Sequence, residues 1–411
     1  MAARIKLRNK VLLGTGVVLA LYAASLRVFD PRMELTPQTV ESAAEGASGY
    51  LVRKLDADGR FEYAIHLDGL PLKEEYNVLR HAGTVYGLSL YYELTGDAPS
   101  YEAILRAARY LLRRHVRPVV QHPELQAVFS LPGEEIRGTN AQAKLGGSAL
   151  GLIALIKARE LDVDAVSLAV LREVGGFLLF MQEENGHFRS IYEETGQFVA
   201  GFQSVFYPGE AILALTLLHE ADSDPRWLDA ALRGIAYLER SRQGMRIGQL
   251  PIDHWLMIAS EAALRHYSAA QAPPISRAQI VNHALAIGTK MIREQWRISL
   301  LPSMQGSFVS DGEITSSSAR LEGLVALYNL LPMDHHDRPR ILESIEAGLG
   351  FVLRAQVQSG AGQGGFTRSF RKRLGFSREI RDANRRQAEI RIDYVQHALS
   401  ALVGYQEIRR R

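Results

Sequence analysis

Residues 207–218 read YPGEAILALTLL, a short polar start followed by eight residues of which seven are apolar. As a helix, residues 211–218 would present an apolar surface in nearly every direction. A helix that is apolar all round is surrounded by protein on every side. The stretch therefore predicts an inner helix whose first turn carries Glu210.

The same arrangement recurs along the chain. Apolar stretches, each preceded by a polar cluster, occupy residues 85–94, 149–156, 256–264, 321–330 and 398–403. Half-charged segments such as residues 101–115 and 225–240 lie between them and show the three-to-four spacing of one buried face. This alternation predicts an all-α fold, the (α/α)6 toroid, with six inner helices, six outer helices and a few short β-hairpins in the loops. The polar first turns of the inner helices would then line one shared pocket.

Composition narrows the classes of function. The chain has 411 residues, of which 47% are hydrophobic, enough for a large packed core. A net charge of +3 and the lack of a basic stretch with interleaved aromatics argue against a nucleic-acid partner. The absence of cysteine excludes disulfides, thiolate nucleophiles and cysteine-ligated metal sites.

The N-terminus predicts a membrane anchor. Four basic residues, Arg4, Lys6, Arg8 and Lys10, precede the uncharged run VLLGTGVVLALYAASL at residues 11–26. We expect residues 1–29 to form a signal-anchor or transmembrane helix, residues 30–45 a linker and residues 46–411 the toroid. The basic flank would stay in the cytoplasm, which predicts a single-pass protein of the cell inner membrane with a periplasmic domain. A cleaved signal peptide and a buried N-terminal helix are the alternatives.

Three linking segments share a loop pattern of Gln, Gly and then an aromatic residue, at residues 182–188, 305–308 and 356–366. This pattern resembles loops of the terpene-cyclase-like and prenyltransferase-like toroids, and of six-hairpin glycosidases. The resemblance implies the (α/α)6 toroid superfamily without assigning a specific family. It says nothing of the reaction, because one fold supports many activities.

Four carboxylates in the polar clusters are candidate catalytic groups: Glu210, Asp253, Glu322 and Asp393. Cleavage of a glycosidic bond commonly uses two carboxyl groups on opposite sides of that bond. We expect Glu210 or Asp253 to act as the acid and Glu322 or Asp393 as the base. The alternatives are structural: Asp253 and Asp393 as helix N-caps, and Glu322 in a salt bridge.

Ten further residues are candidates for substrate binding: Arg80, His81, Asn140, Lys144, Tyr207, His254, Trp255, Arg320, Tyr394 and His397. The cations would bind acidic groups of a glycan, and the aromatic rings would stack on sugar rings. His and Tyr side chains could also serve as acid or base in uronate epimerisation or elimination. Core packing, structural hydrogen bonds and neutralisation of the four acids are the competing interpretations. No metal and no cofactor is predicted.

These residues favour a membrane-anchored, extracytoplasmic enzyme that acts on a glycan or polysaccharide, either as a glycoside hydrolase or as a uronate epimerase or lyase. A second hypothesis is a non-catalytic glycan-binding or assembly subunit of an envelope polysaccharide system, with the basic segment 368–391 contacting a partner. A third is a terpenoid-cyclase-like enzyme. That reaction would require an apolar pocket.

Overall fold

The computed structural model describes residues 35–411, apart from residues 68, 73–75, 137, 371–374 and 376. The anchor predicted over residues 1–29 lies outside the described residues. Within the described part of the chain, no helix is both long enough and apolar enough to cross a membrane.

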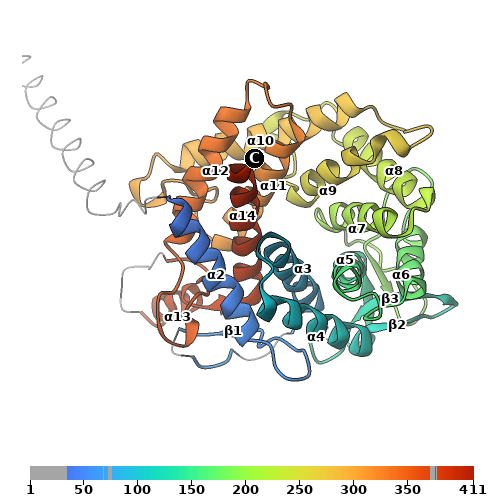
Figure 1. Ribbon diagram of the computed structural model, residues 1–411, viewed down its shortest axis with the longest axis horizontal. Coiled ribbons are helices and arrows are strands. Elements are labelled where there is room, and N and C mark those ends of the chain that lie inside the picture. The colour runs from blue at the N-terminus through green and yellow to red at the C-terminus, as the bar shows by residue number, and fades with distance from the viewer. Residues whose placement is uncertain (1–34, 68, 73–75, 137, 371–374, 376) are drawn as a thin grey trace, which may run out of the picture.

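Six helices of the described chain form a closed inner ring. They are α3 (Val78–Thr95), α5 (Leu145–Leu161), α7 (Tyr207–Asp222), α9 (His254–Arg265), α11 (Ile314–Leu330) and α14 (Ile392–Arg410). Each packs against the next around the ring, and α14 packs back against α3 (Figure 1). In α7, every residue from Pro208 to Leu218 is buried, as the uniformly apolar sequence predicts.

Six outer helices surround this ring: α2 (Pro37–Arg53), α4 (Ala98–Arg114), α6 (Leu168–Phe180), α8 (Pro225–Ser241), α10 (Arg277–Ile298) and α12 (Arg338–Leu353). Each packs against an inner helix, and α2 closes the outer layer by packing on α14 (Figure 1). The predicted toroid is confirmed. Because α2 begins at Pro37, the helical domain starts inside the stretch 30–45 that was expected to be a linker.

The outer helices follow from ordinary helix chemistry. In α8, the side chain of Asp224 caps the helix by accepting a hydrogen bond from the backbone N–H of Arg226, and Pro225 occupies the first turn. Trp227 and Leu228 begin the one buried face of this helix. A short exposed helix, α13 (Arg378–Gln387), precedes α14.

Short strands lie in the connections between helices. Strands β2 (Val116–Val119), β3 (His122–Ser130), β4 (Gln142–Lys144) and β5 (Ile191–Glu193) form one antiparallel sheet in that order, and β1 (Ala64–Ile65) pairs with β6 (Ile390–Arg391). Ala143 in β4 lies opposite Phe129 on one side and Tyr192 on the other. The sheet joins the connection between α4 and α5 to the connection between α6 and α7, and β4 leads directly into α5.

The Gln-Gly-aromatic loops pack against the next outer helix. Gly186 and Gly306 have φ angles of 94° and 85°, a conformation that favours glycine. A Cβ atom at these positions would lie 2.3 Å from the carbonyl oxygen of Arg233 in α8 and 2.0 Å from that of Ala347 in α12. These two loops, each of which follows one outer helix, therefore pack closely against the backbone of the next outer helix.

Candidate active site

A pocket of about 510 Å³ opens at the end of the ring where the inner helices begin. All six inner helices contribute to its lining, which includes Leu79, Arg80, Leu150, Tyr207, Glu210, His254, Trp255, Thr315, Ser316, Arg320, Asp393, Gln396 and His397. Most of these side chains are polar or charged. The polar first turns therefore converge on one pocket, as the sequence predicts, and charged side chains from four of the inner helices line it beside the apolar ones.

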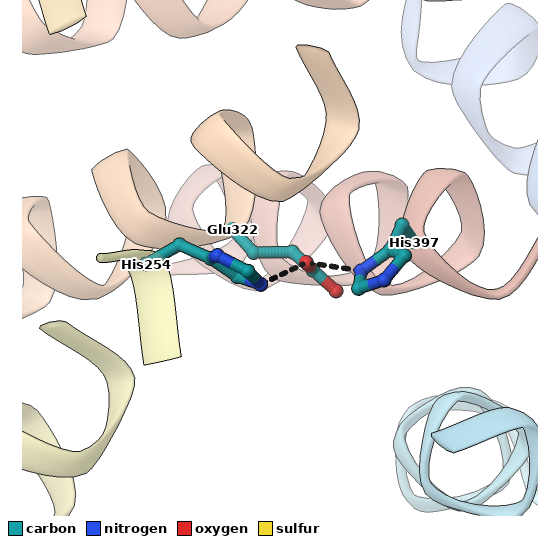
Figure 2. A group of neighbouring side chains, drawn as sticks. All are labelled: His254, Glu322 and His397. Carbon is teal, nitrogen blue, oxygen red and sulfur yellow. Dashed lines mark hydrogen bonds and ion pairs between the residues drawn. The ribbon is translucent and has the colours of Figure 1, made fainter. Parts of the chain in front are cut away.

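Two histidines and a glutamate form a cluster at this pocket (Figure 2). His397 on α14 lies with its Nδ1 2.7 Å from Oε2 of Glu322 on α11. His254, the first residue of α9, places its Nε2 3.9 Å from the same carboxylate oxygen. The two imidazole rings have centroids 5.7 Å apart and meet edge to face. Three side chains from three different inner helices are thus brought together, two of them lining the pocket.

The two imidazoles are driven toward opposite protonation states. Burial, reinforced by the nearby His397 and Arg320, lowers the pKa of His254 well below its ordinary value. Burial acts in the same direction on His397, but the charge of Glu322 and the hydrogen bond to it outweigh burial and raise the pKa of His397. His254 therefore stays neutral to lower pH than an ordinary imidazole and can act as a base, whereas His397 keeps its proton to higher pH and can act as a donor. Two titratable groups with diverging pKa values are typical of an acid–base pair.

The same three side chains are close enough to ligate a metal ion, since their ligand atoms lie within 4.8 Å of one another. In the structure, however, a hydrogen bond already joins His397 to Glu322. The Nε2 atom of His397 lies on the far side of the ring from this contact. The arrangement leaves Nε2 of His397 free to exchange a proton with a bound molecule.

Glu210 lines the pocket from the first turn of α7 and is 5% exposed. Burial, with a contribution from Asp253, raises the pKa of Glu210 to about 8. Its Oε2 atom has no hydrogen-bond partner among the described residues. Gly146 on α5 makes room for it, because a Cβ there would lie 2.2 Å from this oxygen. Near neutral pH Glu210 is therefore largely a carboxylic acid, able to donate a hydrogen bond to a ligand.

Asp393 and two arginines form an ion-paired group on the pocket wall. Asp393 Oδ2 lies 3.0 Å from Nε of Arg80, and Oδ1 accepts a hydrogen bond of 2.7 Å from Nε of Arg391. Burial acts to raise the pKa of Asp393, but the two guanidinium groups outweigh it and lower that pKa. Arg80 also donates a hydrogen bond to the hydroxyl of Tyr63. The carboxylate is therefore ionised and held firmly in place.

Six predicted site residues lie outside the pocket, and three of them, Asp253, His81 and Tyr394, are held by structural contacts. Asp253 caps α9 through the N–H of Leu256 and pairs with Arg242 at 2.9 Å. His81 is fully buried against the outer layer, bonded to Tyr76 at 2.6 Å and to the carbonyl of Ala107 at 3.0 Å.

Tyr394 is also buried, with its hydroxyl donating to Glu389. It follows Asp393 directly in α14, and one residue of helix turns a side chain by about 100°. As a result Asp393 faces the pocket while Tyr394 packs beneath the guanidinium of Arg391.

The remaining candidates lie around the pocket. Arg320 and Trp255 line it. Glu322 does not, because it sits behind His397 and lines a second cavity nearer the opposite end of the ring. Asn140 and Lys144 line a neighbouring side pocket of about 540 Å³. Lys144 is paired there with Glu135, at 3.2 Å.

Two phenylalanines and one glutamate at the cavities were not predicted from the sequence as site residues. Phe206 lines the central pocket and Phe202 lines the side pocket, both from the loop between β5 and α7. Glu135 neutralises Lys144 from the loop that follows β3. The signal for the phenylalanines was the aromatic-rich run FVAGFQSVFY at residues 198–207, which has no helical spacing to explain its apolar residues.

No protein-family model and no curated protein matches the sequence. Solved structures do match in fold. A D-mannose isomerase superimposes with a TM-score of 0.63 at 12% identity, over 93% of this chain and 100% of its own. The cellobiose 2-epimerase of Bacillus thermoamylovorans superimposes with a TM-score of 0.64 at 12% identity, over 91% of this chain and 100% of its own.

The glycoside hydrolase family 76 α-mannanase of Bacteroides thetaiotaomicron gives a TM-score of 0.61 at 12% identity, over 93% of this chain and 100% of its own. At such low identity these similarities concern the fold alone. The chain therefore has the (α/α)6 toroid fold that sugar epimerases and isomerases share with glycoside hydrolases.

Proposed function

We propose that this protein moves a proton at carbon 2 of an aldose, as a sugar 2-epimerase or an aldose–ketose isomerase does. The observation that carries the proposal is the pair His254 and His397, two imidazoles beside one pocket with opposite protonation tendencies. The fold relatives with isomerase and epimerase activity support the same reaction class, since both activities shift a proton next to a carbonyl group.

The chemistry balances within the site. In the open-chain aldose, neutral His254 removes the proton from carbon 2, and the electron pair of that C–H bond forms a double bond between carbons 1 and 2. The carbonyl oxygen takes up negative charge, which protonated His397 stabilises by hydrogen bonding or proton transfer. Delivery of a proton from His397 to the opposite face of carbon 2, with the carbonyl at carbon 1 formed again, gives the epimer. Return of the proton from His254 to carbon 1 gives the ketose, when the carbon 2 hydroxyl gives up its proton as its own carbonyl forms and the oxygen on carbon 1 takes up a proton through His397. No oxidant or reductant is consumed.

The other pocket residues would hold the sugar. Protonated Glu210 donates a hydrogen bond, and Arg80 donates from a guanidinium already fixed by Asp393. A sugar presents hydroxyl groups that both donate and accept, so this mixture of donors and acceptors suits it. The indole of Trp255 lies beside both histidines, with ring centroids 5.2 Å from His254 and 6.4 Å from His397.

Hydrolysis is the second candidate, favoured by one observation: Glu210 is a buried acid with a raised pKa, as a glycosidase proton donor requires. Hydrolysis also requires a second carboxyl group that is free to act in the pocket, and none of the other three candidate acids meets this requirement. Asp253 is outside the pocket, Glu322 lies behind His397, and Asp393 is neutralised by Arg80 and Arg391.

Deuterium exchange tests the proposal. Purified protein is incubated in D₂O with aldoses such as glucose and mannose and with their disaccharides, and carbon 2 is followed by NMR. We expect loss of the carbon 2 proton signal together with formation of an epimer or ketose. Release of a monosaccharide from a disaccharide, with the carbon 2 proton intact, would instead establish hydrolysis.

The exported location, the membrane anchor and an envelope-assembly partner stay predictions from the sequence.

A further inference from the structure

The side pocket adjoins the central pocket. Tyr207 lines both of them. Asn77, which lines the central pocket, donates a hydrogen bond to Glu135, which lines the side pocket. The two cavities therefore share a wall.

A track of three aromatic rings leads from His254 to the side pocket. The ring of Phe206 lies edge-on to His254 with centroids 5.3 Å apart. Tyr207 follows directly in sequence and separates the two cavities. The ring of Phe202 then lies 6.0 Å from that of Tyr207. The track thus begins at one of the two proposed acid–base groups and ends in the neighbouring cavity.

The two phenylalanines at the ends of this track are unusually open to solvent. Phe202 is 44% exposed and Phe206 is 42% exposed, whereas seven of the ten other phenylalanines in the described part of the chain are buried and the remaining three are partly buried. Exposed aromatic side chains grouped at a cavity are typical of a ligand-binding surface. The apolar C–H face of a sugar ring is a suitable partner for them, because its hydroxyl groups remain free at the ring edge.

The cations of both cavities are paired with acids of the same chain. In the side pocket Lys144 lies 3.2 Å from Glu135, and Glu193 adds a second carboxylate to the lining. In the central pocket Arg80 is paired with Asp393, and Arg320 lies 3.7 Å from Glu294. The cations that the sequence suggested for an acidic glycan are thus already neutralised. A neutral sugar fits this lining better than a uronate.

We propose that the side pocket is a second sugar subsite, and that the preferred ligand is a neutral disaccharide or oligosaccharide. Its reducing-end ring occupies the central pocket at His254 and His397, and the next ring packs on the aromatic track and reaches Phe202. The placement of the reducing end rests on the proposed function. The subsite itself rests on the cavity, the aromatic rings and the charge pairing.

Calorimetric titration of the full-length protein tests the subsite without any need for turnover. Glucose is compared with cellobiose, β-1,4-mannobiose and maltose. We expect at least one disaccharide to bind about tenfold tighter than glucose, which corresponds to about 1.4 kcal/mol. The substitution Phe202→Ala is expected to remove most of this preference while glucose binding changes less than about twofold. Phe202→Trp should retain the preference, since it keeps an aromatic face.

Trp296→Ala is the matched control, because Trp296 is 67% exposed on α10 and lies outside both cavities. Equal affinity for glucose and all three disaccharides would overturn the subsite, as would a Phe202→Ala variant that binds every sugar like the wild type. Tighter binding of cellobiouronic acid than of cellobiose would contradict the proposal that the preferred ligand is neutral. A protein that prefers disaccharides but exchanges no carbon 2 proton would refute the proposed function and leave the subsite standing.

Discussion

Replacement of His397 by glutamine is expected to lower kcat for exchange at carbon 2 by about 10³-fold, within the range that a positioned acid–base group contributes. Glutamine retains a hydrogen-bonding amide but can neither hold nor release a proton near neutral pH. Exchange is measured by NMR in D₂O with the sugar that the wild-type protein turns over, and kcat is separated from KM.

His336→Gln is the matched control, because His336 has a side chain that is 84% exposed in a surface turn. Thermal unfolding of both variants checks that the fold is intact. A His397→Gln variant that keeps more than a tenth of the wild-type kcat would remove His397 from the reaction.

Replacement of Glu322 by glutamine is expected to lower kcat by about 10²-fold at mildly alkaline pH and to shift the alkaline limb of the pH profile to lower pH. Four groups face His397: Glu322 from α11, His254 from α9, Arg80 from α3 and Asp393 from its own helix. Glu322 raises the pKa of His397 against the effects of burial and Arg80. Without this charge the pKa of His397 falls, so its protonated form is lost at a lower pH.

The measurement is kcat against pH for the wild type and the variant, with Glu160→Gln as a surface control. Glu160 has a side chain that is 44% exposed at the end of α5. Loss of one partner of a buried ion pair can also destabilise the fold by about 3–5 kcal/mol, so thermal unfolding is recorded in parallel. An alkaline limb that stays in place would show that Glu322 does not control the protonation of His397.

The architecture was predictable because inner and outer helices have different sequence patterns. Segments such as residues 211–218 are apolar on every face, whereas residues 225–240 are apolar on one, and this difference separates the two layers. The convergence of the first turns followed from the same alternation. Glu210, His254 and His397 were therefore brought to one pocket by the fold that the sequence predicts.

The number of turns between each residue and the start of its helix was less predictable. The apolar stretch at residues 321–330 suggested that Glu322 lies in a first turn, but α11 begins at Ile314. Glu322 therefore sits about two turns below the helix start, beneath His397 instead of in the pocket. The small polar residues of 315–318 hid the true beginning, since they show no apolar periodicity.

Side-chain direction within a polar cluster was not predictable either. Asp253 and His254 are adjacent, yet one caps the helix and pairs with Arg242 while the other lines the pocket. Successive residues of a helix point about 100° apart, and this difference decides between the two roles. The sequence alone does not show which residue of the cluster faces the pocket. Contacts between distant loops, such as that of Glu135 with Lys144, depend on tertiary packing and leave no local pattern.

The proposed reaction requires that His254 and His397 favour opposite protonation states beside one pocket. It is tested most directly by an NMR titration of the imidazole nitrogens in ¹⁵N-histidine-labelled protein, with the two residues assigned through His254→Gln and His397→Gln. We expect His254 to stay neutral well below the ordinary imidazole pKa of about 6.5, and His397 to lose its proton only above it. Two imidazoles that titrate together near that value would contradict the acid–base assignment.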